Sequence, residues 1–296
     1  MARQAQSILL YRFLSFRKPT RKLRAYQQER QIFLHNQFHF SSPAAFNDPF
    51  DGKPHFLVRH RTADEYRAYF RRIVSLHPAT QGTTLRQRRD MAERFALEAF
   101  ANPDKLIDAK KLVIETALGA ISICCFAKSY RHVLMWSHYA SGHAGYCIGV
   151  RFSAKVDNKW FPDEVVYSKE YPTIDILEDH QANPQAMSEL TNALLYRKAP
   201  AWRYERECRI VRTFPSGLQE MLPGSVECVI LGARIGDKDR AALLQIVEKS
   251  GSNLKVFQAE LASGSFSIKR RRLLETPLSA PRVERPTIKG TEELFV

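Results

Sequence analysis

Two glutamates stand one residue apart between arginines in A-P-A-W-R-Y-E-R-E-C-R-I-V, residues 199–211. In a β-strand successive side chains alternate between faces, so Glu205 and Glu207 would share one face with Cα atoms about 7 Å apart. That spacing leaves room for one substrate group between two carboxylates, which can stabilise a developing positive charge and accept a proton. The alternatives are a solvated row of charged side chains, with cross-strand pairs worth about 0.2–1 kcal/mol each, and a helix that pairs Glu205 with Arg209. Pro200 and the aromatic residues favour a strand over a helix.

A second acidic stretch, F-N-D-P-F-D, places Asn47, Asp48 and Asp51 close together. Asn and Asp before proline commonly organise a turn by bonding their own backbone, which is the interpretation we favour. The alternative is a substrate- or metal-binding loop. If Asp48 and Asp51 joined Glu205 and Glu207 around Mg²⁺ beside a basic groove, the protein would be a metal-dependent nuclease.

Hydrophobic periodicity predicts the elements that must position these side chains. Short apolar or aromatic runs predict strands over residues 7–13, 38–41, 120–127, 145–152, 164–167, 203–211, 226–232, 254–261 and 266–273. Helical patterns cover residues 20–37, 62–77, 84–101, 103–118, 134–141, 183–198 and 237–249. The order predicts an α+β fold with a mixed, mainly antiparallel sheet.

The domain organisation follows from the same pattern. We expect one α+β domain over residues 1–275, with a helical insertion at about 60–118. Residues 276–296 carry three prolines and little apolar periodicity, so they are expected to be a tail or a loosely docked extension.

The charge balance points to polyanions, because 45 Lys and Arg outnumber 31 Asp and Glu for a net charge of +14. A basic flank near the N-terminus, with Arg21, Lys22 and Arg24, is the candidate nucleic-acid-binding segment. The alternative is a solvated helix face without a partner. The five cysteines have no metal-ligand spacing, and no stretch approaches the length of a membrane span. We therefore expect a cytoplasmic protein with no membrane partner and no resident metal.

Four stretches of this sequence occur in the same order in a bacterial family, domain of unknown function 2971 (DUF2971). They are F-S-S-P-A-A-F-N-D-P-F-D (40–51), L-M-W-S-H-Y-A-S-G-H-A-G-Y-C-I (134–148), K-A-P-A-W-R-Y-E-R-E-C-R-I-V (198–211) and V-I-L-G (229–232). The chain resembles that family over about residues 8–260. The family name implies no activity.

A weaker resemblance is to ADP-ribosyltransferases, which place Arg or His on a first strand, Ser or Tyr on a second, and Glu, often as E-x-E, on a later one. Arg12 after Tyr11, the serine pair after Phe40, and the two glutamates follow that order. The serine pair runs into Pro43, whereas S-T-S is typical of that class.

The resemblance implies a split-sheet fold and NAD as substrate, with nucleic acid or a target bound to nucleic acid as one candidate acceptor. The implied catalytic residues are Glu207, Glu205 and Ser42, and the implied NAD-binding residues are Arg12, Tyr11, Ser41, Asn47 and Trp202. Arg12 would fork onto the pyrophosphate, and a serine hydroxyl would orient ribose or glutamate. Besides the nuclease, the remaining alternative is a non-catalytic nucleic-acid-binding protein.

Overall fold

A computed structural model describes residues 7–17, 24–59, 61–153, 161–178, 184–221 and 226–274. Arg21 and Lys22, both predicted to bind nucleic acid, and the predicted tail at 276–296 lie outside these residues. The first helix, α1 (Gln27–His35), is shorter than predicted at both ends. Tyr26 and Asn36 flank it with left-handed backbone conformations, which an α-helix cannot continue through.

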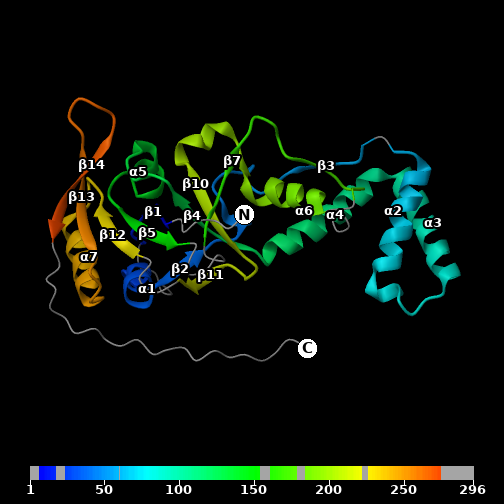
Figure 1. The fold of residues 1–296 in the computed structure, drawn as a ribbon, viewed down its shortest axis with the longest axis horizontal. Coiled ribbons are helices and arrows are strands. Elements are labelled where there is room, and N and C mark those ends of the chain that lie inside the picture. The colour runs from blue at the N-terminus through cyan, green and yellow to red at the C-terminus, as the bar shows by residue number, and fades with distance from the viewer. Residues whose placement is uncertain are drawn as a thin grey trace.

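The core of the fold is an eight-stranded sheet (Figure 1). Its spatial order is β14 (Ile268–Leu274), β13 (Lys255–Leu261), β12 (Val226–Leu231), β5 (Tyr146–Ser153), β1 (Ser7–Leu14), β4 (Ser122–Ala127), β10 (Glu207–Arg212) and β6 (Asp163–Glu164). β12 and β13 run parallel, and the other neighbouring strands run antiparallel. The predicted α+β fold with a mixed, mainly antiparallel sheet is confirmed.

Both faces of this sheet are covered around its central strands, which explains why β12, β5, β1 and β4 read as apolar runs. Along β1, Leu10 and Leu14 pack on the side of α1 and α7 (Asp237–Lys249). Tyr11 and Phe13 alternate with them and pack on the other side, with α5 (Val133–Tyr139). A strand with two buried faces gains apolar burial on every residue, so its sequence does not alternate with polar residues.

The sheet opens between β1 and β4, which form a single residue pair, Tyr11 with Ala127. By contrast, β1 pairs with β5 at eight positions and β4 pairs with β10 at six. Two well-paired groups of strands therefore meet at one pair and diverge from it. Side chains and backbone of both strands border the gap that this divergence leaves.

Short two-stranded ladders surround the main sheet. They pair β2 (Gln37–Phe40) with β11 (Gly217–Glu220), β3 (His55–Leu57) with β8 (Thr173–Asp175), and β7 (Val166–Tyr167) with β9 (Arg197–Lys198). β2 confirms the predicted second strand. A single 3₁₀ turn, η1 (Pro43–Ala45), follows it and redirects the chain toward the gap.

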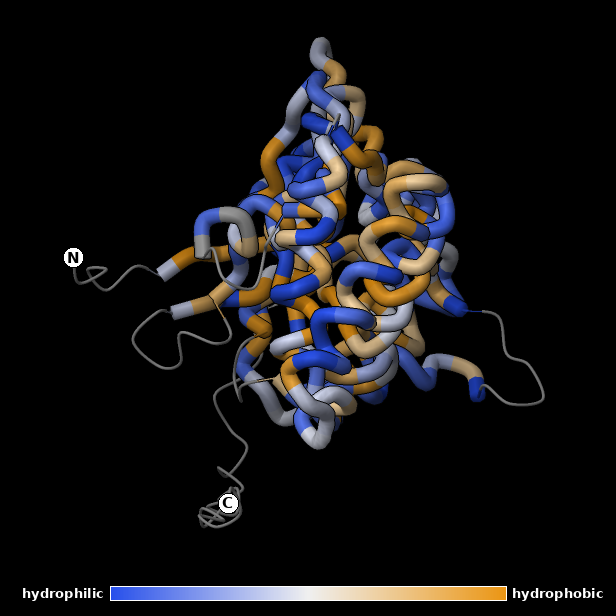
Figure 2. The backbone as a smooth tube through the Cα atoms, turned by 90° about the vertical axis from the view of Figure 1, so that its right-hand side faces the viewer, coloured by the Kyte–Doolittle hydropathy of each residue, from blue (hydrophilic) through white to orange (hydrophobic). Residues whose placement is uncertain are grey.

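Three helices form an arm: α2 (Ala63–Leu76), α3 (Leu85–Ala101) and α4 (Pro103–Gly119), each within a residue or two of its prediction. Thr62 and Glu65 form a capping box at the start of α2. Figure 1 shows α2 and α3 at the opposite end of the molecule from α7. Hydrophobic and hydrophilic stretches alternate along the coils at that end (Figure 2), and Tyr66, Tyr69 and Ala96 bury a small core between α2 and α3.

The predicted strand over 203–211 is wrong in its first half. Residues Pro200–Glu205 form a 3₁₀ helix, η5, and β10 begins only at Glu207. Pro200 stands at the first position of η5, where its fixed φ suits a helix. Arg206 has a φ of 46° and turns the chain from η5 into β10. The predicted helix over 183–198 is α6 (Pro184–Thr191) followed by a π-helical turn (Asn192–Tyr196).

Within the described ranges, the structure contains no helix with the length and apolar character that a membrane span requires.

Candidate functional site

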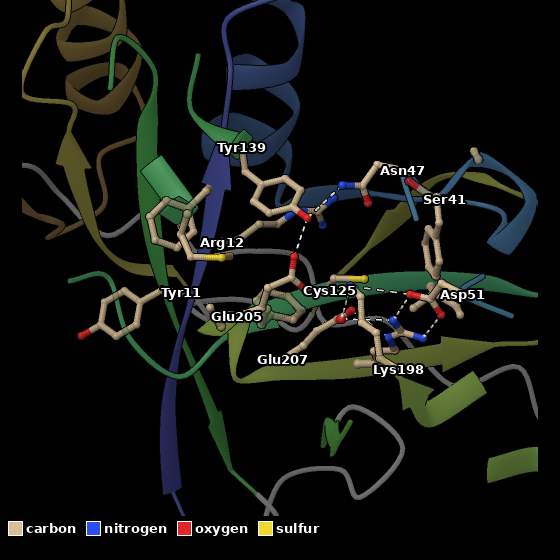
Figure 3. A pocket seen from close by; sticks show the side chains of 18 residues that line it. Tyr11, Arg12, Ser41, Asn47, Asp51, Cys125, Tyr139, Lys198, Glu205 and Glu207 are labelled. Atoms are coloured by element: carbon tan, nitrogen blue, oxygen red, sulfur yellow. Dashed lines mark hydrogen bonds and ion pairs between the residues drawn. The ribbon is translucent and has the colours of Figure 1, made fainter. Parts of the chain in front are cut away.

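A cavity of about 290 Å³ lies where β1 and β4 diverge. Side chains from five stretches of the chain line it, within residues 11–13, 41–51, 123–127, 135–139 and 198–209, and Figure 3 shows them converging. Its polar lining residues are Arg12, Ser41, Asn47, Asp51, Cys125, Tyr139, Lys198, Glu205, Glu207 and Arg209. The volume is at the small end of the range for ligand pockets, so it suits one end of a larger ligand.

A buried ion-pair network forms the floor of this cavity, and Lys198 is its centre. The Lys198 ammonium donates to Glu205 Oε2 at 2.6 Å and to Glu207 Oε2 at 3.0 Å, and it lies 3.6 Å from Asp51 Oδ2. Each of these side chains is at most 5% exposed. The two glutamates therefore do share a hollow, but Lys198 occupies the position that we expected a substrate group to take.

Arg209 is the second cation of the network and lies on the same face of β10 as Glu207, as strand alternation predicts. Its Nε donates to Glu207 Oε1 at 2.7 Å, and its two terminal nitrogens fork onto the two carboxylate oxygens of Asp51. Bidentate pairing of this kind is among the strongest side-chain contacts. The five network residues thus hold three carboxylates against two cations, which leaves one negative charge in surplus.

Glu205 reaches the network from η5 and not from a strand. In a 3₁₀ helix residues three apart lie on one face, so Trp202 and Glu205 both face Lys198. The Lys198 ammonium is 5.0 Å from the centre of the Trp202 ring. The other Glu205 oxygen accepts from the Tyr139 hydroxyl at 2.5 Å, and Asn47 donates to that hydroxyl at 3.2 Å (Figure 3).

The two glutamates have opposite pKa shifts. Burial by itself raises the pKa of Glu207, but Arg209 and Lys198 outweigh burial and lower it to about 2. Burial raises the pKa of Glu205, and only Lys198 and Tyr139 oppose it. Lys198 is held charged, because Glu207 and Glu205 raise its pKa against the effect of burial. Of the two glutamates, Glu205 is therefore the one that takes up a proton first.

Arg12 stands apart from this network. Its guanidinium donates to the carbonyl of His39 at 2.8 Å and to the Cys124 sulfur, both uncharged acceptors. Among the described residues no carboxylate forms an ion pair with it. A half-buried arginine without a counter-ion is a feature of anion-binding sites, since protein charges that leave water are ordinarily paired.

The remaining predicted site residues divide into two groups. Tyr11, Ser41 and Asn47 line the cavity, although Figure 3 shows the Tyr11 ring turned away from the network. Ser42 and Trp202 do not line it. The Ser42 hydroxyl instead accepts from the backbone N–H of Ala44 and caps η1, because Pro43 starts that turn directly after it.

The acidic loop after β2 is a turn, as we favoured. Asp48 is buried and its Oδ1 accepts from the backbone N–H of Phe50 at 2.9 Å. Asp51 points the other way, into the network. In the part of the chain that the structure describes, no group of three or more His, Cys, Asp and Glu side chains is arranged to hold a metal ion.

Sequence reasoning missed Lys198, Tyr139 and Cys125, and it gave Arg209 no role at the site. Lys198, Tyr139 and Arg209 lie within the family stretches, where they could have been noticed. The sequence does not indicate that these residues contact one another, because the contacting pairs are far apart along the chain. Tyr139 is 66 residues from Glu205, and Asp51 is 158 residues from Arg209. Cys125 lies beside Glu207 on the neighbouring strand, and burial first and Glu207 second raise its thiol pKa.

Comparison with known proteins identifies one family. The model of a protein of unknown function (DUF2971) matches residues 135–210, which supports the resemblance to this family predicted from the sequence over that segment. That segment contains Tyr139, Lys198, Glu205, Glu207 and Arg209. No curated protein and no solved structure matches the chain.

Proposed function

We propose that this protein cleaves the bond between nicotinamide and ribose in NAD and transfers the ADP-ribose to an acceptor. One observation carries the proposal: a cavity with an acidic network of surplus negative charge on one side and an arginine without a carboxylate partner on the other. NAD has the matching polarity, since its ribosyl–nicotinamide end is cationic and its pyrophosphate is anionic.

The surplus charge suits the transition state of this reaction. As the glycosidic bond breaks, its electron pair leaves with nicotinamide and positive charge develops on the ribose. Fixed carboxylates in a cavity shielded from water stabilise such charge without reorganising. Glu205 is the candidate for direct contact, because each of its oxygens has one donor, whereas Glu207 Oε2 has two. Glu207 is a positioning residue that holds Lys198 and Arg209.

Arg12 supplies the anion-binding end. A guanidinium presents its donors in a planar fork that matches a phosphate group, and it stays charged at all physiological pH values. The group lies on β1, which borders the cavity. Ser41 also lines the cavity, and its hydroxyl makes a long hydrogen bond, 3.5 Å to His39 Nδ1, which it can exchange for one to the ribose, whereas Ser42 is occupied in capping η1.

The acceptor must lose a proton as its lone pair bonds to the anomeric carbon. Glu205 is the nearest proton acceptor in this scheme, and its raised pKa makes it a better base than an ordinary glutamate once it is ionised. Tyr139, which donates to Glu205, keeps its own proton because burial and then the Glu205 hydrogen bond raise its pKa. Tyr139 therefore orients Glu205.

The nuclease alternative has less support. Both oxygens of Asp51 accept from Arg209, and Glu205 and Glu207 are each bonded to Lys198. To coordinate Mg²⁺ these carboxylates would have to break buried ion pairs, and removing a partner from such a pair costs about 3–5 kcal/mol.

The test is nicotinamide release from NAD, measured by chromatography, with NAD binding measured by calorimetry. Glu205→Gln should reduce the rate about 100-fold or more, the typical contribution of a general base. Glu170→Gln, an exposed glutamate, and Ser42→Ala should stay within about twofold of the parent. Arg12→Lys should raise KM more than it lowers kcat. Lysine keeps the positive charge, but it cannot donate the two parallel hydrogen bonds that a planar guanidinium gives to a phosphate.

A protein that neither binds NAD nor releases nicotinamide, while unfolding cooperatively, contradicts this proposal. Cleavage of nucleic acid that requires added Mg²⁺ would favour the nuclease instead.

A further inference from the structure

A second cavity, of about 380 Å³, lies on the other side of Glu205, which borders both cavities. Three segments form it: the chain before α5, the end of η5, and the loop between β13 and β14. Around it lies a surface that we call the basic–aromatic surface, formed by Arg131, His132, Arg203, Tyr204, Arg206 and Phe266.

Three rings lie on this surface: that of Phe266 is exposed, and those of His132 and Tyr204 are half-buried. His132 stacks on Tyr204 with ring centres 5.1 Å apart and an interplanar angle of 22°. Phe266 is fully exposed, at 104% of its reference area. A backbone hydrogen bond from Ile268 to the carbonyl of Arg131, at 3.4 Å, ties the Phe266 loop to the chain before α5. An exposed phenylalanine contributes no burial energy to the fold, so its ring faces are free for a ligand.

The same surface carries unbalanced positive charge. Arg131, Arg203 and Arg206 are exposed, and none forms an ion pair with a described residue. Arg206 lies between this cavity and a third one of about 310 Å³, which Lys128, Arg203 and Glu207 also line. Glu164, an acidic residue that also lines the third cavity, is already paired with Lys128 at 2.5 Å.

We infer that the basic–aromatic surface binds single-stranded nucleic acid and presents one nucleotide to Glu205 as the acceptor of ADP-ribose. This inference rests on the proposed function. Stacked and exposed rings bind unpaired bases, whereas arginines without acidic partners bind the phosphates between them, and this combination is typical of single-strand binding. In a duplex the faces of the bases are stacked on one another, so aromatic side chains cannot stack on them. The net charge of +14 adds long-range attraction to any polyanion.

Binding is tested on the full chain with fluorescent single-stranded DNA and RNA of about 20 nucleotides, by anisotropy at NaCl concentrations from about 50 to 200 mM. The test variant is Arg131→Glu/Arg206→Glu. Its matched control is Arg86→Glu/Arg89→Glu, which reverses two exposed arginines on α3 that likewise form no ion pair with a described residue. Phe266→Ala is compared with Phe214→Ala, another exposed phenylalanine.

The double reversal on the surface should weaken binding at least tenfold and make the slope of log K against log[salt] shallower by about 1.4, or 0.7 for each lost phosphate contact. Phe266→Ala should weaken binding at least about fivefold, the lower limit for one stacked base. Both controls should stay within about twofold of the parent protein.

Three results would overturn this inference. They are unchanged binding by the surface variants, tighter binding of a duplex of the same sequence, and loss of binding only when Arg21, Lys22 and Arg24 are reversed.

Mass spectrometry of the oligonucleotide after incubation with NAD separates the two proposals. Nicotinamide release without any increase in oligonucleotide mass excludes the nucleotide as acceptor and leaves NAD cleavage standing. Oligonucleotide binding without nicotinamide release excludes the proposed function and the acceptor role together, and it leaves a binding surface.

Discussion

Replacing Lys198 with methionine isolates the charge at the centre of the network. The ammonium lies within 3.6 Å of three carboxylates, those of Glu205, Glu207 and Asp51. Methionine keeps an unbranched stem of similar length, so packing changes little while the charge disappears. Three buried carboxylates are then left with Arg209 as their cation.

The magnitude follows from burial. The side chains of Lys198 and its three partners are at most 5% exposed, so solvent screens the lost interactions weakly. Removing one partner from a buried ion pair costs about 3–5 kcal/mol, because the remaining charge stays out of water. At about 2–4 °C for each kcal/mol in a protein of this size, the melting temperature should fall on the order of 10 °C.

The loss should also depend on pH, because Glu205 already has a raised pKa. A carboxyl whose folded pKa lies above its unfolded value destabilises the fold when ionised, and that cost is relieved as pH falls through the folded pKa. Without Lys198 this pKa rises further. The difference in unfolding free energy between parent and variant should therefore be larger at about pH 7.5 than at about pH 5.5.

Urea unfolding at both pH values measures the effect. Lys255→Met is the matched control, since Lys255 pairs with Glu227 at 3.3 Å but its side chain is 52% exposed. That surface pair should be worth no more than about 1 kcal/mol at either pH. If Lys198→Met costs less than about 1 kcal/mol at the higher pH, or costs the same at both, our account of the Lys198–Glu205 pair is refuted.

Other parts of the structure give further expectations. The pKa of Glu207 is lowered to about 2 from an ordinary 4.5, which should contribute about 3 kcal/mol to the free energy of unfolding. That contribution is present above pH 4.5 and is lost as pH falls toward 2. The urea midpoint of the parent protein as a function of pH measures it. Gly145→Ala should destabilise the protein by more than about 2 kcal/mol, because the new Cβ would lie 2.2 Å from the backbone oxygen of Leu14. At Gly82 a new Cβ has no atom within 4 Å, so Gly82→Ala should leave the melting temperature unchanged. Cys125 should resist iodoacetamide at about pH 8 until the protein is unfolded, since burial raises its pKa; rapid native labelling in mass spectrometry would contradict this.

The family stretches were informative about the site because they contain nearly all of its members. Asp51, Tyr139, Lys198 and the two glutamates all lie inside stretches quoted from the sequence. The reason given for the glutamates was only half correct. Period-two alternation holds from Glu207 to Arg209, whereas Glu205 reaches the same cavity because η5 ends there and Arg206 reverses the backbone.

Local signals determined the elements of this protein. Apolar runs, the Thr62 capping box and the proline at the start of η1 act within a few residues of each other, so the sequence displays them directly. The α+β class and the three helices of the arm followed from such signals.

Only the tertiary structure decided how charge is balanced in the cavity. Pairing of Lys198 with Glu205 and Glu207 depends on a turn that no periodicity describes, and the fork of Arg209 on Asp51 joins residues 158 apart. The cavity itself exists because β1 and β4 share one residue pair and then diverge. Strand register and strand divergence arise from packing across the whole sheet, and a single sequence does not record them.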